Sequence, residues 1–319
     1  MSARRVFVTG ATGVIGRLVV PRLIARGHRA TAVGRTAQRR AELTALGATA
    51  VELDLLDAAA VRRAVEGHDV VVNLATHMPS SSLKMMLPWA WRENDRLRRE
   101  GSAALAQAAL ATGVSRFVQE SFAPVYEDGG ERWIDEQWPQ RPARYNRTVL
   151  DAERSAARFA AGGGAAVVLR FAGFYGPDPL LRELVATARR GWSPLPGPAE
   201  AYWSSVSHQD AAAAVLAALD LPSGAYNVCD DEPLARRDWA DALADAAGLK
   251  RPRLLPRWLL PWGGSLLELL SRSQRMSNTK LKTATAWTPR WRSARAGLHD
   301  AVHSLSRVSG TQYAIRHAD

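Results

Sequence analysis

The stretch VFVTGATGVIG, residues 6–16, is the part of this sequence that says most about its fold. The three apolar residues that open the stretch predict a short buried strand, and apolar residues recur at helical spacing from Leu18 to Ile24. Between the two lie three glycines at the spacing G-x-x-G-x-x-G. Strand, glycine turn and helix in this order predict a dinucleotide-binding unit.

The three glycines have different expected roles. Gly10 permits the tight turn, Gly13 lets the backbone approach a pyrophosphate, and Gly16 lets the helix pack closely on the strand. The free N–H groups and the positive end of the helix dipole then hold the phosphates. An ordinary glycine-rich turn is the alternative, and the flanking strand and helix weigh against it. The residues of the turn that we expect to contact the cofactor are Gly10, Thr12, Gly13, Val14, Ile15 and Gly16.

The residues directly after the second expected strand, 29–33, indicate which nucleotide is bound. In NAD-binding proteins an acid about 20 residues past the glycines binds the ribose 2′-hydroxyl. Gly34 and Arg35 occupy that place here, and Arg39 and Arg40 come one turn into the next helix. Because a guanidinium binds two phosphate oxygens at once, Arg35 predicts NADP(H); a surface arginine is the alternative.

Strands and helices alternate through the first half of the chain. Further strands are expected at 48–53, 69–73 and 116–120, and helices at 58–66 and 91–112. Asp54 follows the third strand and is expected to reach the adenine. This alternation predicts an α/β fold with a doubly wound parallel Rossmann sheet and a smaller C-terminal substrate-binding lobe.

Length and composition bound the class of protein. The chain has 319 residues, 47% of them hydrophobic, which suffices for one large domain or a domain with a lobe. Its single cysteine, Cys229, excludes an intrachain disulfide framework and a cysteine-cluster metal site. No His/Asp/Glu group has metal-ligand spacing, so no metal is expected.

Charge and hydropathy indicate the expected binding partners and the cellular location. The net charge is +11, but the arginines are scattered along the chain, which favours an anionic cofactor or a solvated surface over nucleic acid. The N-terminus runs into the first strand, so we expect no signal peptide and a cytoplasmic protein. No apolar run of about 18 residues predicts a membrane span. The sequence leaves open whether the chain forms a homodimer.

Later segments carry a family resemblance. They are, with residue numbers, TGATGVIG (9–16), DL (54–55), NLA (73–75), FVQESFAPVY (117–126), YNRTVLDAE (145–153), LRFAGFYGP (169–177), VSHQD (206–210), YNV (226–228) and AWTPR (286–290). Together they resemble the extended short-chain dehydrogenase/reductases, the NAD-dependent epimerase/dehydratase group. The resemblance implies further cofactor contacts by Asp54, Leu55, Leu74, Ala75, Thr76, Tyr145, Phe171 and Phe174.

The departures from the family concern catalysis. There a tyrosine is the general acid/base, a lysine four residues on lowers its pKa, and a serine or threonine orients the carbonyl. The tyrosine place here is Tyr145, but the lysine place is Val149 and the serine place is Phe122, beside Ser121. A phenol without a nearby cation keeps a pKa of about 10. A positioned acid or base contributes roughly 10²- to 10⁴-fold, so we expect slower chemistry by a non-standard proton donor and unimpaired cofactor binding.

The candidates for the catalytic proton are Tyr145, Ser121 and His77. His77 follows the fourth strand, near the expected nicotinamide, where its imidazole would protonate an alkoxide; a surface loop histidine is the alternative. Glu120 and Ser121 end a central strand, where ligands bind in doubly wound sheets.

Other polar residues have competing interpretations. Arg144 and Arg147 flank Tyr145 and would supply the missing cation or bind an anionic substrate, unless they are solvated helix surface. Ser207, His208 and Asp210 precede a helix, so capping explains them better than catalysis.

The expected organisation is an NADP-binding domain over residues 1–173, to which the chain returns at about 203–228. Residues 174–202 and 229–306 would form the lobe, and 307–319 a loosely held tail. The proline-broken apolar segment 258–262 would line the core or a substrate pocket, with membrane-surface contact as the alternative.

These residues predict an NADPH-dependent oxidoreductase, a carbonyl reductase acting on a small to medium apolar organic molecule. The tryptophans and leucines of the lobe favour an apolar pocket. A sugar-nucleotide epimerase or dehydratase is one alternative, disfavoured by Val149 and Phe122. A catalytically silent NADP(H)-binding sensor or scaffold is the other.

Overall fold

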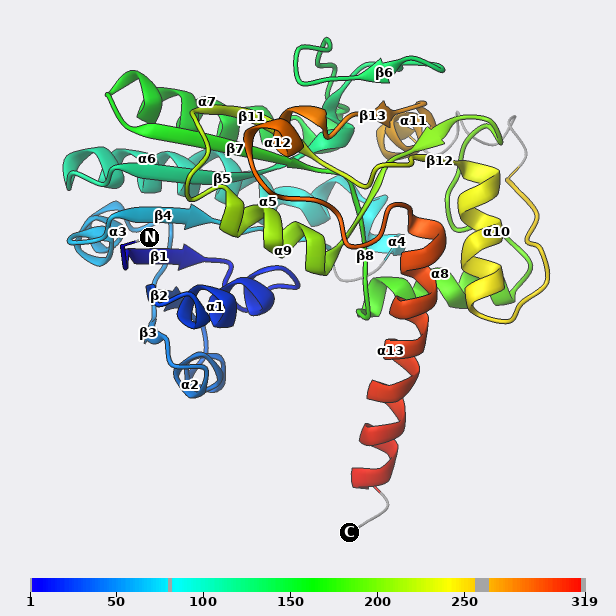
Figure 1. Cartoon of the computed structure of the whole chain (residues 1–319), viewed down its shortest axis with the longest axis horizontal. Helices are drawn as coiled ribbons and strands as arrows, with labels where there is room; N and C mark the ends of the chain where they lie inside the picture. Colours follow the sequence, from blue (N-terminus) through cyan, green and yellow to red (C-terminus); the bar gives the residue numbers. More distant parts are fainter. Residues whose placement is uncertain (1, 80–81, 256–263, 317–319) are drawn as a thin grey trace.

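A seven-stranded parallel sheet forms the centre of the computed structural model, which describes residues 2–79, 82–255 and 264–316 (Figure 1). Its strand order is β11-β7-β5-β4-β1-β2-β3. The strands are β1 (Arg5–Thr9), β2 (Arg29–Val33), β3 (Thr49–Val51), β4 (Val70–Asn73), β5 (Arg116–Phe122), β7 (Ala165–Phe171) and β11 (Gly224–Val228). The order reverses between β1 and β4, and ligands bind in doubly wound sheets at the carboxyl ends of the strands beside such a point.

Helices cover both faces of the sheet (Figure 1). One face carries α1 (Gly16–Ala25) and α9 (His208–Ala217), and the other carries α3 (Ala58–Val65), α6 (Ser102–Ala111) and α7 (Val149–Ala161). In β1, Val6 and Val8 join the first hydrophobic cluster and Phe7 joins the second, because successive side chains of a strand point to opposite faces. The predicted doubly wound fold is confirmed. At the sheet edge, α2 (Ala37–Ala45) packs beside β3.

The segment between β4 and β5 differs from the single helix expected over 91–112. After α4 (Ser82–Met85) come the 3₁₀ turn η1 (Pro88–Trp91), α5 (Arg92–Arg96), the π-helical turn η2 (Leu97–Gly101) and α6. A π turn changes the direction in which the following side chains project, and such turns are frequent at functional sites. This one contains Arg98.

A third hydrophobic cluster lies in the C-terminal part of the chain. It joins α8 (Pro179–Arg189), α10 (Arg236–Ala246) and α13 (Ala294–Arg316) through residues that include Leu181, Trp239 and Leu298. Three short strand pairs accompany it: β8 (Gly173–Tyr175) with β10 (Ser205–Ser207), β9 (Tyr202–Trp203) with β12 (Leu234–Ala235), and β6 (Trp133–Ile134) with β13 (Arg275–Met276). The elements η3 (Ala123–Val125), η4 (Arg144–Asn146), α11 (Gly264–Ser271) and α12 (Thr279–Ala284) complete the described chain. We propose that this cluster is the core of the substrate-binding lobe.

The C-terminal segment is part of a helix and not a separate tail. Residues 307–316, expected as part of a tail, belong to α13, whose end extends away from the body of the molecule (Figure 1). The apolar segment 258–262 lies outside the described residues.

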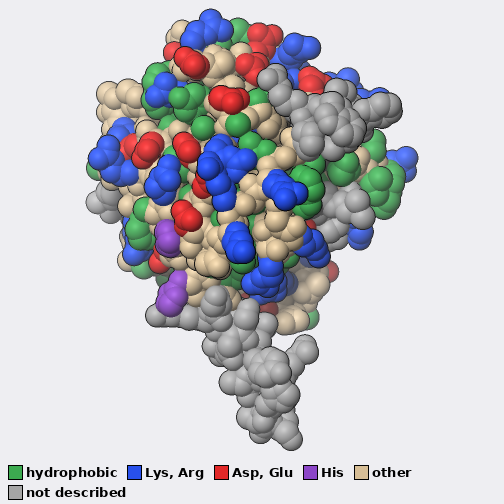
Figure 2. All heavy atoms as spheres, turned by 90° about the vertical axis from the view of Figure 1, so that its right-hand side faces the viewer, with side chains coloured by type: hydrophobic (Ala, Val, Ile, Leu, Met, Phe, Trp, Pro, Cys, Tyr) green, Lys and Arg blue, Asp and Glu red, His purple; other side chains and the backbone are tan. Residues whose placement is uncertain are grey.

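The surface agrees with the dispersed charge of the sequence. On the face shown in Figure 2, Lys and Arg side chains are interspersed with Asp and Glu. Among the described helices none is long and apolar enough to cross a membrane.

Candidate active site

A cavity of about 560 Å³ opens at the carboxyl ends of β1, β2 and β4, beside the reversal of strand order. Its lining comes from the segments at the ends of β1, β2, β3 and β4 and from α5 and η2. The lining residues are Thr9, Gly10, Thr12, Gly13, Val33, Arg35, Thr36, Arg39, Glu52, Leu53, Asp54, Leu55, Leu74, Ala75, Thr76, Glu93 and Leu97. The cofactor contacts expected after β2, β3 and β4, which are Arg35, Asp54, Leu55, Leu74, Ala75 and Thr76, all line this cavity, whereas His77 does not.

The three glycines differ in the space around them: Gly10 and Gly16 are tightly packed, and Gly10 and Gly13 line the cavity. Gly10 has φ +65°, and a Cβ there would lie 2.2 Å from the carbonyl oxygen of Leu74. A Cβ on Gly16 would lie 2.2 Å from the carbonyl oxygen of Gly10. At Gly13 the same test finds only the oxygen of Gly10, at 3.2 Å, and Gly13 lines the cavity. The space beside the Gly13 Cα is therefore open toward the cavity, as the expected pyrophosphate contact requires.

The start of α1 suits a phosphate. Its N-cap residue is Ile15, and no side-chain hydrogen bond caps the helix. Helix starts of this kind bind anions in dinucleotide-binding folds. Ile15 itself is buried in the core, and Val14 lines a different cavity of about 200 Å³ beside His208. For these two side chains the expected cofactor contact stays a prediction.

Arg35 and Arg39 both line the cavity, whereas Arg40 does not, and the three arginines differ in their partners. Arg39 pairs with Glu42 at 3.0 Å, and Arg40 pairs with Glu52 at 2.7 Å. Arg35 is exposed and lines the cavity, and no acidic side chain within the described ranges is paired with it. The geometry thus leaves Arg35 free to bind a 2′-phosphate.

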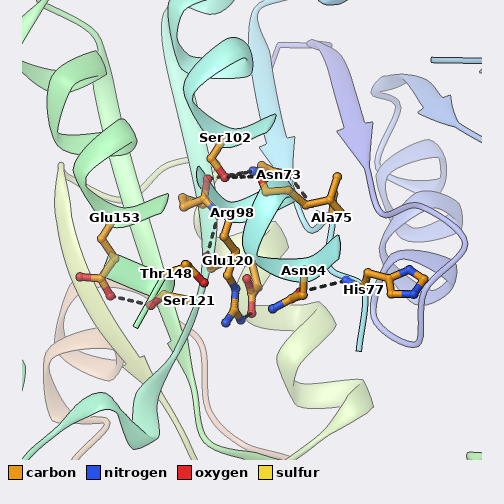
Figure 3. A network of polar contacts seen from close by, with 12 residues as sticks. Asn73, Ala75, His77, Asn94, Arg98, Ser102, Glu120, Ser121, Thr148 and Glu153 are labelled. Atoms are coloured by element: carbon orange, nitrogen blue, oxygen red, sulfur yellow. Dashed lines mark hydrogen bonds and ion pairs between the residues drawn. The ribbon is translucent and has the colours of Figure 1, made fainter. Parts of the chain in front are cut away.

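A buried hydrogen-bond network fixes the loop after β4 (Figure 3). The Asn73 side chain accepts from Thr9 Oγ1 at 2.6 Å and donates to Ser102 Oγ at 3.1 Å and to Gln119 Oε1 at 2.9 Å. Its Oδ1 also accepts from the backbone N–H of Ala75 at 3.2 Å. Asn73 thereby holds residues 74–76 against the cavity.

Tyr145 lies in the 3₁₀ turn η4, one turn before α7, and its ring contacts Trp91 with centroids 4.8 Å apart. Burial raises the pKa of the Tyr145 phenol above its usual range, while the positive charges of Arg98 and Arg272 act in the opposite direction. Val149, at the lysine place, is fully buried in the core. The phenol is therefore protonated at neutral pH and can donate a hydrogen bond.

The Ser121 hydroxyl donates a hydrogen bond to a neighbouring carboxylate. Ser121 is fully buried, and its Oγ donates to Glu153 Oε1 at 2.5 Å. Glu153 also accepts from Arg170 Nε at 2.9 Å and Nη2 at 2.7 Å, and Arg170 Nη1 donates to Tyr126 Oη at 2.9 Å. Ser121 thus belongs to a buried network that joins β5, α7 and β7. Sequence reasoning missed Glu153 and Arg170, although a charged residue within the apolar run of β7 was a signal.

The His77 side chain points away from these groups (Figure 3). His77 is exposed, and its backbone N–H donates to Asn94 Oδ1 at 2.9 Å. The ring therefore is not brought beside Tyr145 and Ser121, and its proposed catalytic role remains a prediction.

The two phenylalanines pack on each other. The ring centroids of Phe171 and Phe174 are 5.4 Å apart, and Phe174 meets His208 edge-on at 5.9 Å. Neither lines the cavity of about 560 Å³.

The prediction that Ser207 caps a helix is confirmed, because Ser207 Oγ accepts from the backbone N–H of Asp210 at 3.0 Å as the N-cap of α9.

The cations near Tyr145 differ from those expected. Arg144 and Arg147 are exposed, whereas Arg98 is 4% exposed and forms an ion pair with Glu120 at 3.2 Å. Arg98 went unnoticed in the sequence because it lies in a run of alternating charges that resembles a solvated helix face.

Comparisons with known proteins identify sequence relatives and proteins of similar fold. A family model described as NAD(P)H-binding matches residues 10–222. A 3-diazoavenalumate denitrifying reductase from Streptomyces sp is 34% identical over 92% of this chain and 99% of its own. A 2-alkyl-3-oxoalkanoate reductase from Shewanella oneidensis is 30% identical over 83% of this chain and 72% of its own. A UDP-glucose 4-epimerase from Thermotoga maritima, solved with UDP-glucose, superposes with a TM-score of 0.77 over 96% of this chain and 99% of its own; at 22% identity this likeness shows the fold.

Proposed function

The chain belongs to the NAD(P)H-binding short-chain dehydrogenase/reductases of the epimerase/dehydratase type, and we propose that it is an NADPH-dependent carbonyl reductase of a small to medium apolar organic molecule. It is an oxidoreductase by its family and by the reductases related to it. The observation that supports a carbonyl acceptor is Tyr145, a phenol kept neutral by burial with buried cations near it. The Shewanella relative, named as an oxoalkanoate reductase, supports the same acceptor.

The residues present fit bound NADPH, and they favour reduction of a carbonyl over oxidation of an alcohol. Gly13 and the uncapped start of α1 would hold the pyrophosphate, and Arg35 the 2′-phosphate. Bound NADPH supplies the hydride to the carbonyl carbon. As the carbonyl electron pair moves to oxygen, the Tyr145 phenol donates the proton, and solvent returns a proton to the phenolate. A neutral phenol suits this reduction and suits alcohol oxidation poorly, because oxidation needs a base.

A second candidate acceptor is an aromatic diazonium group. Val149 favours it, because hydride delivery to the terminal nitrogen needs no proton from the protein. The resulting aryl diazene loses N₂ and retains the hydrogen on carbon, so an aryl diazonium and NADPH yield the arene, N₂ and NADP⁺. The name of the Streptomyces relative supports this chemistry.

One experiment separates the proposals. Purified protein is given NADPH with a panel of aryl ketones and 3-oxo acids, with aryl diazonium salts, and with UDP-sugars. Alcohol formed in step with NADPH oxidation supports carbonyl reduction, and N₂ released in its place supports the second candidate. Interconversion of UDP-sugars without net NADPH consumption would contradict both, and tight NADPH binding with no turnover would identify a sensor or scaffold.

Replacing Arg35 with alanine is expected to remove most of the preference for NADPH. The unmutated protein should bind NADPH at least about tenfold more tightly than NADH, since a charge-assisted hydrogen bond contributes about 1.5–3 kcal/mol. The measurement is the dissociation constant of each cofactor from the quenching of protein fluorescence. Arg40→Ala is the matched control, because Arg40 is paired with Glu52 and should leave the ratio unchanged. Equal affinities in the unmutated protein would contradict the proposal.

Tyr145→Phe is expected to slow ketone reduction by roughly 10- to 100-fold without abolishing it, because one donor is lost while orientation is kept. Since the pKa of Tyr145 is raised, the phenol stays protonated as the pH rises, and the rate of the unmutated protein should not fall between about pH 6 and pH 9. Single-turnover NADPH oxidation measures both. Ser121→Ala and His77→Ala serve as comparators, and a larger loss in either would assign the proton to that residue. An unchanged rate in Tyr145→Phe would show that the Tyr145 phenol has no role in catalysis.

A further inference from the structure

Arg98 and Glu120 form a buried ion pair at the carboxyl end of the central sheet (Figure 3). Arg98 comes from the π turn η2 and Glu120 from the end of β5, and their side chains are 4% and 13% exposed. In Figure 3 the pair lies between Ser121 and Thr148 on one side and Asn94 on the other. Glu120 directly precedes the candidate Ser121, and the positive charge of Arg98 acts on the Tyr145 phenol.

The guanidinium of Arg98 is incompletely satisfied. Its Nη2 bonds to Glu120, but its Nε is buried without a hydrogen-bond partner. The Nδ2 of Asn94, which is fully buried nearby on α5, is unpartnered as well. Buried donors are almost always paired, so such groups call for an explanation, and a bound ligand is one.

Arg170 shows what a purely structural arginine looks like in the same sheet. Its Nε and Nη2 form a bidentate pair with Glu153, and its Nη1 donates to Tyr126 Oη and to the carbonyl oxygen of Glu136. Arg98 makes a single contact to its carboxylate, so donor capacity remains for a ligand.

We propose that Arg98 is the cation of the reaction centre, whose guanidinium stabilises the negative charge that develops on the substrate oxygen during hydride transfer, and that Glu120 positions it. This inference rests on the proposed carbonyl reduction. The hydride adds to carbon, the carbonyl electron pair moves to oxygen, and Tyr145 gives the proton, while Arg98 keeps all of its own. The positive charge of Arg98 also opposes the rise that burial causes in the pKa of Tyr145.

The placement accounts for the loss of the lysine. Val149 supplies no charge, and Arg98, on the turn η2 that packs against α7, replaces the electrostatic part of a lysine's role. It does not replace a proton relay, because arginine stays protonated. Preorganised donors aimed at developing charge are worth most in a buried site.

The test compares Arg98→Met with Arg99→Met in the full chain. Arg98→Met is expected to lower kcat for ketone reduction by about 100- to 1,000-fold, the loss found when one oxyanion donor is removed. The dissociation constant of NADPH should change little. Arg99 is the neighbouring control, 56% exposed and 3.8 Å from Asp151, and its variant should keep the unmutated kcat.

Rescue distinguishes charge from structure. Guanidinium ion at millimolar concentration should restore part of kcat to Arg98→Ala and none to Tyr145→Phe, and Arg98→Lys should retain more activity than Arg98→Met. If Arg98→Met unfolds, the double variant Arg98→Met/Glu120→Leu removes both charges and is expected to fold with the same loss of kcat. Folded variants with an unmutated kcat overturn the inference alone. Failure of the unmutated protein to reduce any ketone overturns the proposed function, and the inference with it.

Discussion

Replacing Gly13 with valine is expected to weaken NADPH binding by at least about 100-fold while leaving the fold intact. The valine side chain would occupy the space that the pyrophosphate needs, and several charge-assisted hydrogen bonds of about 1.5–3 kcal/mol each would be lost. The fold should largely survive, because the one atom near a Cβ on Gly13 is the carbonyl oxygen of Gly10, at 3.2 Å, and a shift of a few tenths of an ångström relieves this tight contact. Fluorescence titration with NADPH measures the affinity, and circular dichroism with thermal unfolding checks the fold.

Two further variants give this result its control. Gly13→Ala adds only the methyl group and should lose less affinity than Gly13→Val. Gly10→Ala should lower stability itself, because Gly10 has φ +65° and the added carbon would lie 2.2 Å from the Leu74 carbonyl oxygen. Tight NADPH binding by a folded Gly13→Val protein would place the phosphates elsewhere.

The second large effect is expected on stability. Glu153→Leu leaves the Arg170 guanidinium, 6% exposed, without its carboxylate partner. Removing one member of a buried ion pair costs about 3–5 kcal/mol, because the remaining charge stays desolvated and uncompensated. It also leaves the Ser121 hydroxyl without its acceptor. We expect the free energy of unfolding in urea to fall by that amount.

The matched control lies on the same helix. Arg154 pairs with Asp151 on the surface of α7 and is 64% exposed, so Arg154→Leu should change the free energy of unfolding by less than about 1 kcal/mol. The double variant Glu153→Leu/Arg170→Met should recover part of the loss, since apolar replacement of a buried pair is often tolerated. Equal, small losses in Glu153→Leu and Arg154→Leu would show that the network does not stabilise the fold.

Local sequence was sufficient for the cofactor half of the protein. The strand, the glycine spacing and the helix lie within about 20 residues, so their geometry follows from local rules of turn and helix formation. The same holds for Arg35, because the end of β2 is placed by its distance along the chain from the turn. Leu74, Ala75 and Thr76 follow β4, and the parallel sheet necessarily brings them to the same edge.

The doubly wound sheet, the residues that line the cavity beside the strand reversal, and the valine at the lysine place could all be inferred from the sequence, because each depends on the identity of a residue and its position along a strand or helix. Which polar groups meet could not be inferred, because it depends on how separate elements pack. Ser121 was a candidate proton donor by position, yet its hydroxyl is bound to Glu153, 32 residues away on α7. Arg98 resembles one charge among several in a surface-like run, yet a π turn buries it against Glu120. Such pairings depend on the side-chain direction and burial that the packing of separate elements imposes, and no local pattern encodes them.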